Sequence, residues 1–315
     1  MFKIKKTPPF TFAPKFRLEE IPIPLEEQKE HTKKERQEIE ENVSKIEEAF
    51  KTMPFEVMDQ KAIKKEIEKL GIDHFVDPHF PPRDTSIHCF TEPYPYKQIV
   101  HWRRPHEFMK NPRIFVDDID PNDIKQGYLP DCWFLSSLSS LAERPDLVRR
   151  LIITQEYNKE GIYKVRLCKN GEWIVITVDD YIPCYYNGGP MFSRGNGEEL
   201  WVMLLEKAYA KMHGCYYSLR YGFTHHGMLD LTGCPTWSLK IPEDKPDYSA
   251  IEDFAEELWD KILDADEQGF LISGETPGFD TVTEGKSPPK FLSVYIRILN
   301  KSLSHTFYSN LTKPI

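Results

Sequence analysis

Near its start the chain carries a charged segment in which apolar residues recur at helical spacing. Residues 26–53 are dense in Glu and Lys, and their apolar residues fall at i, i+4, i+7 and i+11: Ile39, Val43, Ile46 and Phe50. This spacing predicts an amphipathic helix. A stripe of under three heptads favours packing on the protein's own core over a coiled coil. A protein partner bound through this 26–53 helix is the alternative.

Further along, the pattern predicts a mixture of helices and strands. Asn170-Gly171 lies between two β-rich runs and is the strongest short signal for a hairpin, while Ser249-x-x-Glu252 is a capping box that opens a helix. The expected elements are helices over 132–142, over 198–213 and from 249 onward, and strands over 162–168, 173–182 and 270–273. This order indicates an α+β fold rather than a regular βαβ alternation.

Composition narrows the class of protein. The 315 residues include 41 Lys and Arg against 50 Asp and Glu, a net charge of −9, which argues against a nucleic-acid binder. The longest apolar run, Leu200 to Leu205, is far too short for a membrane span. No signal peptide is recognisable, so we expect a cytoplasmic protein.

The six cysteines form no Cys-x-x-Cys pair, so we expect mostly buried thiols without disulfides or zinc. The adjacent histidines His225 and His226 favour a polar loop over a metal pair.

Cys132 stands where a loop becomes an apolar helix. The positive end of a helix macrodipole stabilises a thiolate, which makes a cysteine at this position a candidate nucleophile. Spacing alone still allows a buried structural cysteine. Gln126 adds weight, because an amide on the preceding Gly-containing turn can donate to a developing oxyanion.

The segment Gln126-Gly-Tyr-Leu-Pro-Asp-Cys132-Trp-Phe-Leu resembles the active-site segment of calpains, which are papain-fold cysteine endopeptidases of the cytosol. Further blocks agree in order: Phe80-Pro-Pro, Trp102-Arg-Arg-Pro, Val178-Asp-Asp-Tyr-Ile-Pro183, Glu199-Leu-Trp201 and Leu205-Glu-Lys-Ala-Tyr-Ala-Lys211. The resemblance covers roughly residues 75–285. It implies Cys132 as nucleophile, Gln126 as oxyanion donor and proteins as substrates. Pro130 departs from the family's glycine, and proline removes an N–H from this turn.

The resemblance also predicts divisions of the chain. We expect a papain-like fold with a helical, cysteine-bearing subdomain and the start of a β-rich second one. The divisions are an extended arm over 1–25, a charged helical region over 26–74, the cysteine-bearing subdomain over 75–240, the start of the second over 241–290 and a divergent tail over 291–315.

The catalytic base has no clear counterpart. In calpains it lies in a Gly-His-Ala-Tyr segment that an Asn-Pro-Trp segment follows, and this sequence contains neither. His305 is a weak candidate, since no glycine precedes it and Asn310 is only five residues beyond. We therefore expect an incomplete chain with weak or no activity alone. The alternative is a scaffold built on a degenerate protease domain.

Calcium is a candidate cofactor. The segment that begins at Asp118 does not fit an EF-hand loop, because its sixth position is not Gly and Leu129 stands where the loop needs a Glu. By the resemblance, a calpain-type site would use the carbonyls of Val116 and Asp118 with the side chains of Asp123 and Glu199. Glu198 could replace Glu199, and a hydrated acidic loop is the plainer interpretation.

Overall fold

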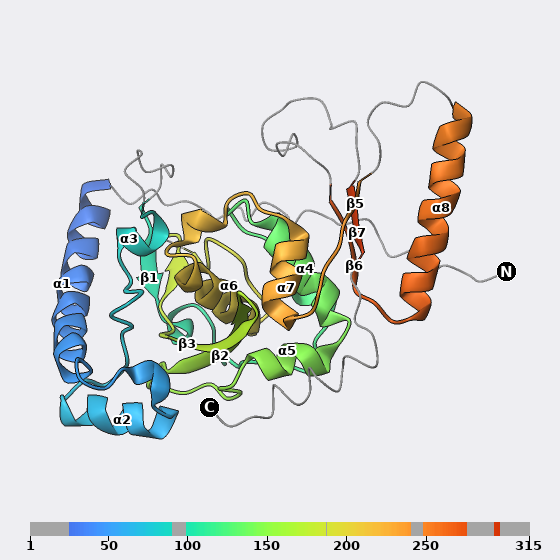
Figure 1. The fold of residues 1–315 in the computed structure, drawn as a ribbon. Coiled ribbons are helices and arrows are strands. Elements are labelled where there is room, and N and C mark those ends of the chain that lie inside the picture. The colour runs from blue at the N-terminus through green and yellow to red at the C-terminus, as the bar shows by residue number, and fades with distance from the viewer. Residues whose placement is uncertain (1–24, 90–98, 187, 241–247, 276–292, 297–315) are drawn as a thin grey trace.

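The computed structural model describes residues 25–89, 99–186, 188–240, 248–275 and 293–296. Helices and a few short strands occur in irregular order along these ranges (Figure 1), which agrees with an α+β fold. The α-helices are α1 Leu25–Ala49, α2 Gln60–Lys69, α3 Asp84–Ile87, α4 Cys132–Ala142, α5 Pro145–Leu151, α6 Trp201–Met212, α7 Thr224–Thr232 and α8 Tyr248–Glu267. The 3₁₀-helices are η1 Phe55–Val57, η2 Pro105–Glu107, η3 Pro121–Asp123 and η4 Tyr216–Leu219.

The strands of the described residues form three small antiparallel sheets, β1 with β4, β2 with β3, and β7 between β5 and β6. Their bounds are β1 His101–Arg103, β2 Tyr163–Lys169, β3 Glu172–Val178, β4 Ile182–Cys184, β5 Leu239–Lys240, β6 Ile272–Glu275 and β7 Ser293–Ile296. The predicted hairpin is confirmed as β2 and β3. Asn170 and Gly171 have φ of 52° and 82°, the left-handed pair that a two-residue I′ turn requires.

The charged helix packs on the protein's own core. Val43 and Ile46 of α1 are fully buried, and Ile39 and Phe50 are nearly so. The helix ends at Ala49 instead of continuing to residue 53, because Pro54 starts a separate 3₁₀ turn. A second helix, α2, lies within the charged helical region predicted over 26–74, and its Ile63 and Ile67 are fully buried.

Helix α4 lies at the centre of the fold and packs against α5 and α7 (Figure 1). Phe134 and Leu138 of α4 are fully buried, and the Phe134 ring stacks on Tyr209 of α6 at 4.2 Å. Residues 201–210 of α6 are all buried, so this helix is covered on all sides. The apolar core therefore fixes the position of α4, the helix that begins at Cys132.

The His225-His226 segment is helical, which corrects the predicted polar loop. Gly227 allows α7 to approach α4 closely, since a Cβ at Gly227 would lie 2.6 Å from Ser137 Oγ. Gly233 ends α7 in the left-handed conformation, with φ 64°. The sequence pattern missed this helix because its apolar periodicity is weak.

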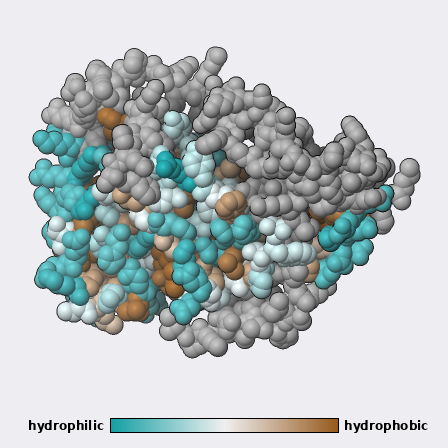
Figure 2. Space-filling model, turned by 45° about the horizontal axis from the view of Figure 1, so that its top comes forward, coloured by the Kyte–Doolittle hydropathy of each residue, from teal (hydrophilic) through white to brown (hydrophobic). Residues whose placement is uncertain are grey.

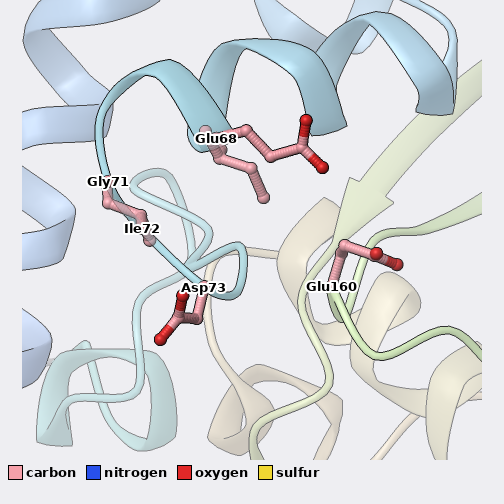
Figure 3. Close-up of a pocket in the computed structure, with 6 residues that line it drawn as sticks. Glu68, Gly71, Ile72, Asp73 and Glu160 are labelled. Carbon is pink, nitrogen blue, oxygen red and sulfur yellow. The ribbon is translucent and has the colours of Figure 1, made fainter.

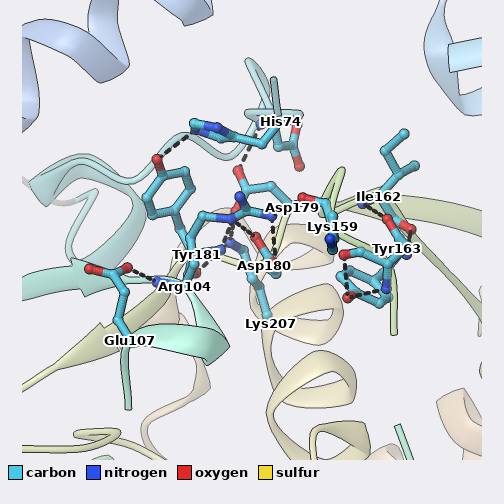
Figure 4. Close-up of polar contacts among 12 residues, drawn as sticks. His74, Arg104, Glu107, Lys159, Ile162, Tyr163, Asp179, Asp180, Tyr181 and Lys207 are labelled. Carbon is cyan, nitrogen blue, oxygen red and sulfur yellow. Dashed lines mark hydrogen bonds and ion pairs between the residues drawn. The ribbon is translucent and has the colours of Figure 1, made fainter. Parts of the chain in front are cut away.

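Buried ion pairs hold the turn between β3 and β4 (Figure 4). Lys207 of α6 is fully buried and pairs with Asp179, while Arg104 Nε donates to Asp180 Oδ1 at 2.7 Å. Lys207 also donates to the Tyr181 carbonyl at 2.7 Å. Removing one partner of such a pair leaves a buried uncompensated charge, so this network stabilises one arrangement of these segments.

Hydrophilic side chains cover much of the described surface in the view of Figure 2, most densely on the side where α1 lies. Among the helices of the described ranges, none combines the length and apolar character that crossing a membrane requires.

Candidate active site

Cys132 is the first residue of α4, and its side chain is exposed. The rest of the helix is anchored in the core, so the thiol is carried by a rigid element. All six cysteines lie in the described ranges, and none is in a disulfide. This geometry places an accessible sulfur at the positive end of a helix macrodipole, as a thiolate nucleophile requires.

The Gln126-Gly127 turn is held against residues 191–194. Lys125 and Arg194 exchange two backbone hydrogen bonds of 3.0 Å, and the Tyr128 N–H donates to Met191 O at 2.8 Å. Gly127 is required here, because a Cβ would lie 1.9 Å from Phe192 O. The turn that carries Gln126 is therefore fixed by backbone contacts.

The Gln126 amide folds back toward the segment before the nucleophile. Its Nε2 donates to Leu129 O at 3.2 Å, three residues before Cys132. An amide nitrogen carries two hydrogens, so this bond leaves a second donor for another acceptor.

The loop after η4 braces the other side of this turn. Trp133 Nε1 donates to Leu219 O at 2.7 Å, and the Tyr221 N–H donates to Pro130 O at 3.3 Å. Tyr221 has a left-handed φ of 59°, a strained conformation for an aromatic residue. The Pro130 carbonyl thus helps to hold the turn in place, because it accepts this hydrogen bond.

Three exposed aromatic side chains lie on the segments that flank Cys132. Tyr128 stands on the preceding turn, and Tyr221 and Phe223 stand on the bracing loop. Their exposed fractions are 58%, 59% and 50%. Each therefore presents apolar ring surface to solvent.

A buried pair of carboxyl groups lies beneath the nucleophile. Asp131 is fully buried, neither of its oxygens receives a hydrogen bond from an N–H or hydroxyl of the described residues, and it faces Glu206 of α6. Burial raises the pKa of Glu206 to about 7, and burial together with Glu206 raises the pKa of Asp131 well above its ordinary value. A proton shared between the two groups satisfies both.

This pair was not predicted from the sequence. The available signal was a charged residue at 206 within an apolar helix, together with a carboxylate directly before the nucleophile.

The candidate calcium residues are partly brought together. Glu199 is buried and accepts the Val116 N–H at 2.8 Å through Oε1, while its Oε2 makes no hydrogen bond to the described residues. Asp123 is also buried and accepts the Asp120 N–H at 2.8 Å. Burial and the negative charge of Asp123 raise the pKa of Glu199. Two neighbouring buried carboxylates suit a hard cation.

Glu198 faces elsewhere and accepts the Lys110 N–H at 3.0 Å. Asp118 is exposed. The residue before it, Asp117, has a left-handed φ of 56°. No group of three or more His, Cys, Asp or Glu side chains within the described ranges is arranged to bind a metal, so backbone carbonyls would have to complete the site.

Two surface pockets lie away from Cys132. One of 350 Å³ opens beside the candidate calcium residues and is lined by Asn111, Arg113, Val116, Asn196, Gly197 and Glu198. The other, of 260 Å³, lies between the end of α2 and Glu160 (Figure 3). Glu160 is paired there with Lys64, so we assign this pocket no chemistry.

His305 and Asn310 lie outside the described residues. The rings of His225 and His226 meet edge to face at the start of α7, with centroids 4.2 Å apart, and burial together with His226 lowers the pKa of His225.

A sequence profile of the calpain family cysteine proteases matches residues 75–296. The chain is 38% identical over 225 residues to the calpain-type cysteine protease DEK1 of Arabidopsis thaliana. This match covers 69% of this chain and 10% of that protein. It is 33% identical over 231 residues to calpain-5 of Rattus norvegicus, which covers 70% of this chain and 35% of that protein. The profile and both relatives are those of cysteine proteases. The chain belongs to the calpain family.

Proposed function

We propose that this chain supplies the nucleophile and oxyanion site of a cysteine endopeptidase that cleaves protein substrates. The observation that carries the proposal is the exposed Cys132 at the N-terminus of the core-anchored helix α4. The Cys132 thiolate attacks a peptide carbonyl, and the Gln126 amide and the Cys132 N–H hold the developing oxyanion. The exposed rings of Tyr128, Tyr221 and Phe223 pack against apolar substrate side chains.

A reactive ketone tests this mechanism, because a peptidyl chloromethyl ketone forms an oxyanion on reacting, whereas iodoacetamide forms none. We expect Gln126→Ala to slow inactivation by the ketone and to leave the iodoacetamide reaction at Cys132 unchanged. Gln155→Ala is the matched control, since that amide donates to Arg149 O at 2.8 Å, away from the turn. Equal rates for the wild type and Gln126→Ala with the ketone would remove Gln126 from the oxyanion site.

Calcium binding is the second part of the proposal. The side chains of Asp123 and Glu199, with the carbonyls of Val116 and Asp118, hold one calcium ion between residues 116–123 and the start of α6. The burial of Glu199 and Asp123 and the effect of the Asp123 charge on Glu199 support this assignment. The ion would neutralise the buried carboxylates and organise the loop that leads to Gln126.

The proposal lacks a catalytic base, because no histidine of this sequence stands in the family's Gly-His-Ala-Tyr form. That absence also favours a second candidate, a scaffold that keeps the nucleophile without turnover. Alkylation of Cys132 requires only the thiolate, whereas peptide cleavage requires a proton donated to the leaving nitrogen. The two functions therefore differ in turnover and not in thiol reactivity.

A further inference from the structure

Two cysteines far apart in sequence lie side by side, away from the proposed nucleophile. Cys89 is exposed and follows α3, whereas Cys215 is buried directly before η4. Their sulfur atoms are 2.7 Å apart, within about 0.7 Å of the ~2.05 Å bond length of a disulfide. The Cys89 N–H also donates to Cys215 Sγ at 3.2 Å, so the backbone holds the two residues together.

We propose that Cys89 and Cys215 are an oxidisable dithiol that closes to an intramolecular disulfide and reopens on reduction. One thiol is accessible to a small oxidant and the other is buried behind it, which is the arrangement of an attacking and a resolving cysteine. Cys168 and Cys234, by contrast, are both buried and lack an exposed partner to start the exchange.

A neighbouring hydroxyl supports the chemistry. Ser218 Oγ lies 3.3 Å from Cys215 Sγ and 3.9 Å from Cys89 Sγ, so it can donate a hydrogen bond to either thiolate. Burial and the adjacent Cys215 raise the pKa of Cys89. The thiolate fraction of Cys89 therefore grows as the solution becomes alkaline, and exchange should accelerate with it.

The oxidant is a small-molecule disulfide such as oxidised glutathione. The Cys89 thiolate attacks one glutathione sulfur, forms a mixed disulfide and expels a glutathione thiolate. The Cys215 thiolate then attacks the Cys89 sulfur and expels the second glutathione thiolate. The two protons from the cysteines end on the two glutathione thiolates, and two electrons pass from the protein to glutathione.

The disulfide would join two segments 126 residues apart. The Cys215 side leads through η4 to Leu219 and Tyr221, which hydrogen-bond Trp133 and Pro130 on either side of Cys132. Oxidation would therefore anchor the loop that braces the nucleophile. Closing so long a loop also restricts the unfolded chain and should raise the melting temperature by several degrees.

The test is oxidation of the full chain with a glutathione redox buffer at mildly alkaline pH. Remaining thiols are counted by mass-tagging with maleimide under denaturing conditions, and cross-linked peptides are mapped. We expect the Cys89 and Cys215 thiols to be lost together, a Cys89–Cys215 peptide to appear, and both thiols to return on reduction. The same disulfide should form in Cys132→Ala, which separates this site from the proposed nucleophile.

Single substitutions test which cysteines form the disulfide. Cys89→Ser changes an exposed side chain and should abolish the disulfide and the rise in melting temperature, whereas the control Cys234→Ser should retain both. Ser218→Ala should slow closure without preventing it. Six thiols throughout the titration, a stable glutathione adduct on Cys89 with Cys215 still reduced, or a disulfide that includes Cys132 would each overturn the proposal.

Discussion

At the scale of single residues, the reactivity of Cys132 depends on where its helix begins. The thiol stands at the first turn of α4, where backbone N–H groups point outward and the macrodipole is positive. The other exposed cysteine, Cys89, has a pKa raised by burial of its sulfur and by Cys215. Exposure alone therefore does not make the two thiols equivalent.

We predict that Cys132 is the most reactive of the six thiols. Limiting iodoacetamide followed by peptide mapping should place most of the label on Cys132, because the helix terminus stabilises its thiolate. The Cys132→Ala variant provides the background. Preferential labelling of Cys89, Cys168 or Cys215 with Cys132 inert would contradict this prediction.

The buried carboxyl pair predicts a dependence of stability on pH. The pKa of Glu206 is raised from 4.5 to about 7 in the folded chain, so the folded state holds a proton that the unfolded state releases. Its contribution is complete below the unfolded pKa and is lost as the pH rises through about 7, a change on the order of 3 kcal/mol.

Urea unfolding across this pH window should show the loss in the wild type and a flatter profile in Glu206→Gln. The exposed Glu143→Gln is the control and should keep the wild-type slope. A slope that Glu206→Gln leaves unchanged would exclude the pair as its source.

At the scale of elements, the active-site turn depends on close backbone contact with residues 191–194. Gly127 allows the contact, and the hydrogen bonds of Lys125 and Tyr128 with Arg194 and Met191 fix its register. No side chain can be added at Gly127 unless the turn moves away from that segment.

Gly127→Ala should destabilise the chain by about 1–3 kcal/mol, because the added methyl group overlaps a carbonyl in a packed region. The displaced turn should also slow the reaction of the peptidyl ketone at Cys132. Gly189→Ala serves as control, since a Cβ there meets nothing within 4 Å. Equal stability of Gly127→Ala and Gly189→Ala in urea would show that the turn is not constrained as described.

At the scale of the whole molecule, one calcium ion would connect residues 116–123 with the start of α6. These segments already contact each other through Glu199 and Val116. A ligand that binds the folded form stabilises it by mass action.

Millimolar calcium should raise the melting temperature and lower hydrogen exchange in both segments together. Glu199→Gln should lose these effects, whereas the neighbouring Glu198→Gln should keep them because Glu198 faces Lys110. Exchange that calcium leaves unchanged in both segments of the wild type would remove the site.

Turnover is also a property of the whole molecule, since it requires the base as well as the nucleophile. We predict no calcium-dependent hydrolysis of an unfolded protein substrate above the Cys132→Ala background, and no change on making His305→Ala. A longer chain or a partner that supplies a Gly-His segment should restore cleavage. Cleavage by this chain that both substitutions abolish would identify His305 as the base.

The local elements were predictable where their signals are local. The apolar stripe of α1, the Asn170-Gly171 turn and the start of α4 at Cys132 each follow from a short stretch of sequence. The family was also predictable, because the segment around Cys132 and several other blocks occur together in order. Helix α7 was not predicted, because the apolar periodicity near His225 is weak.

Contacts between distant segments were decided by the tertiary structure. Asp131 and Glu206 are far apart in sequence, and only the packing of α4 against α6 buries their carboxyl groups together. The same holds for the sulfur atoms of Cys89 and Cys215. The sequence specifies which groups can react or ionise. Their burial and their neighbours arise only when the chain folds, and these set the pKa of each group and the partners that it can contact.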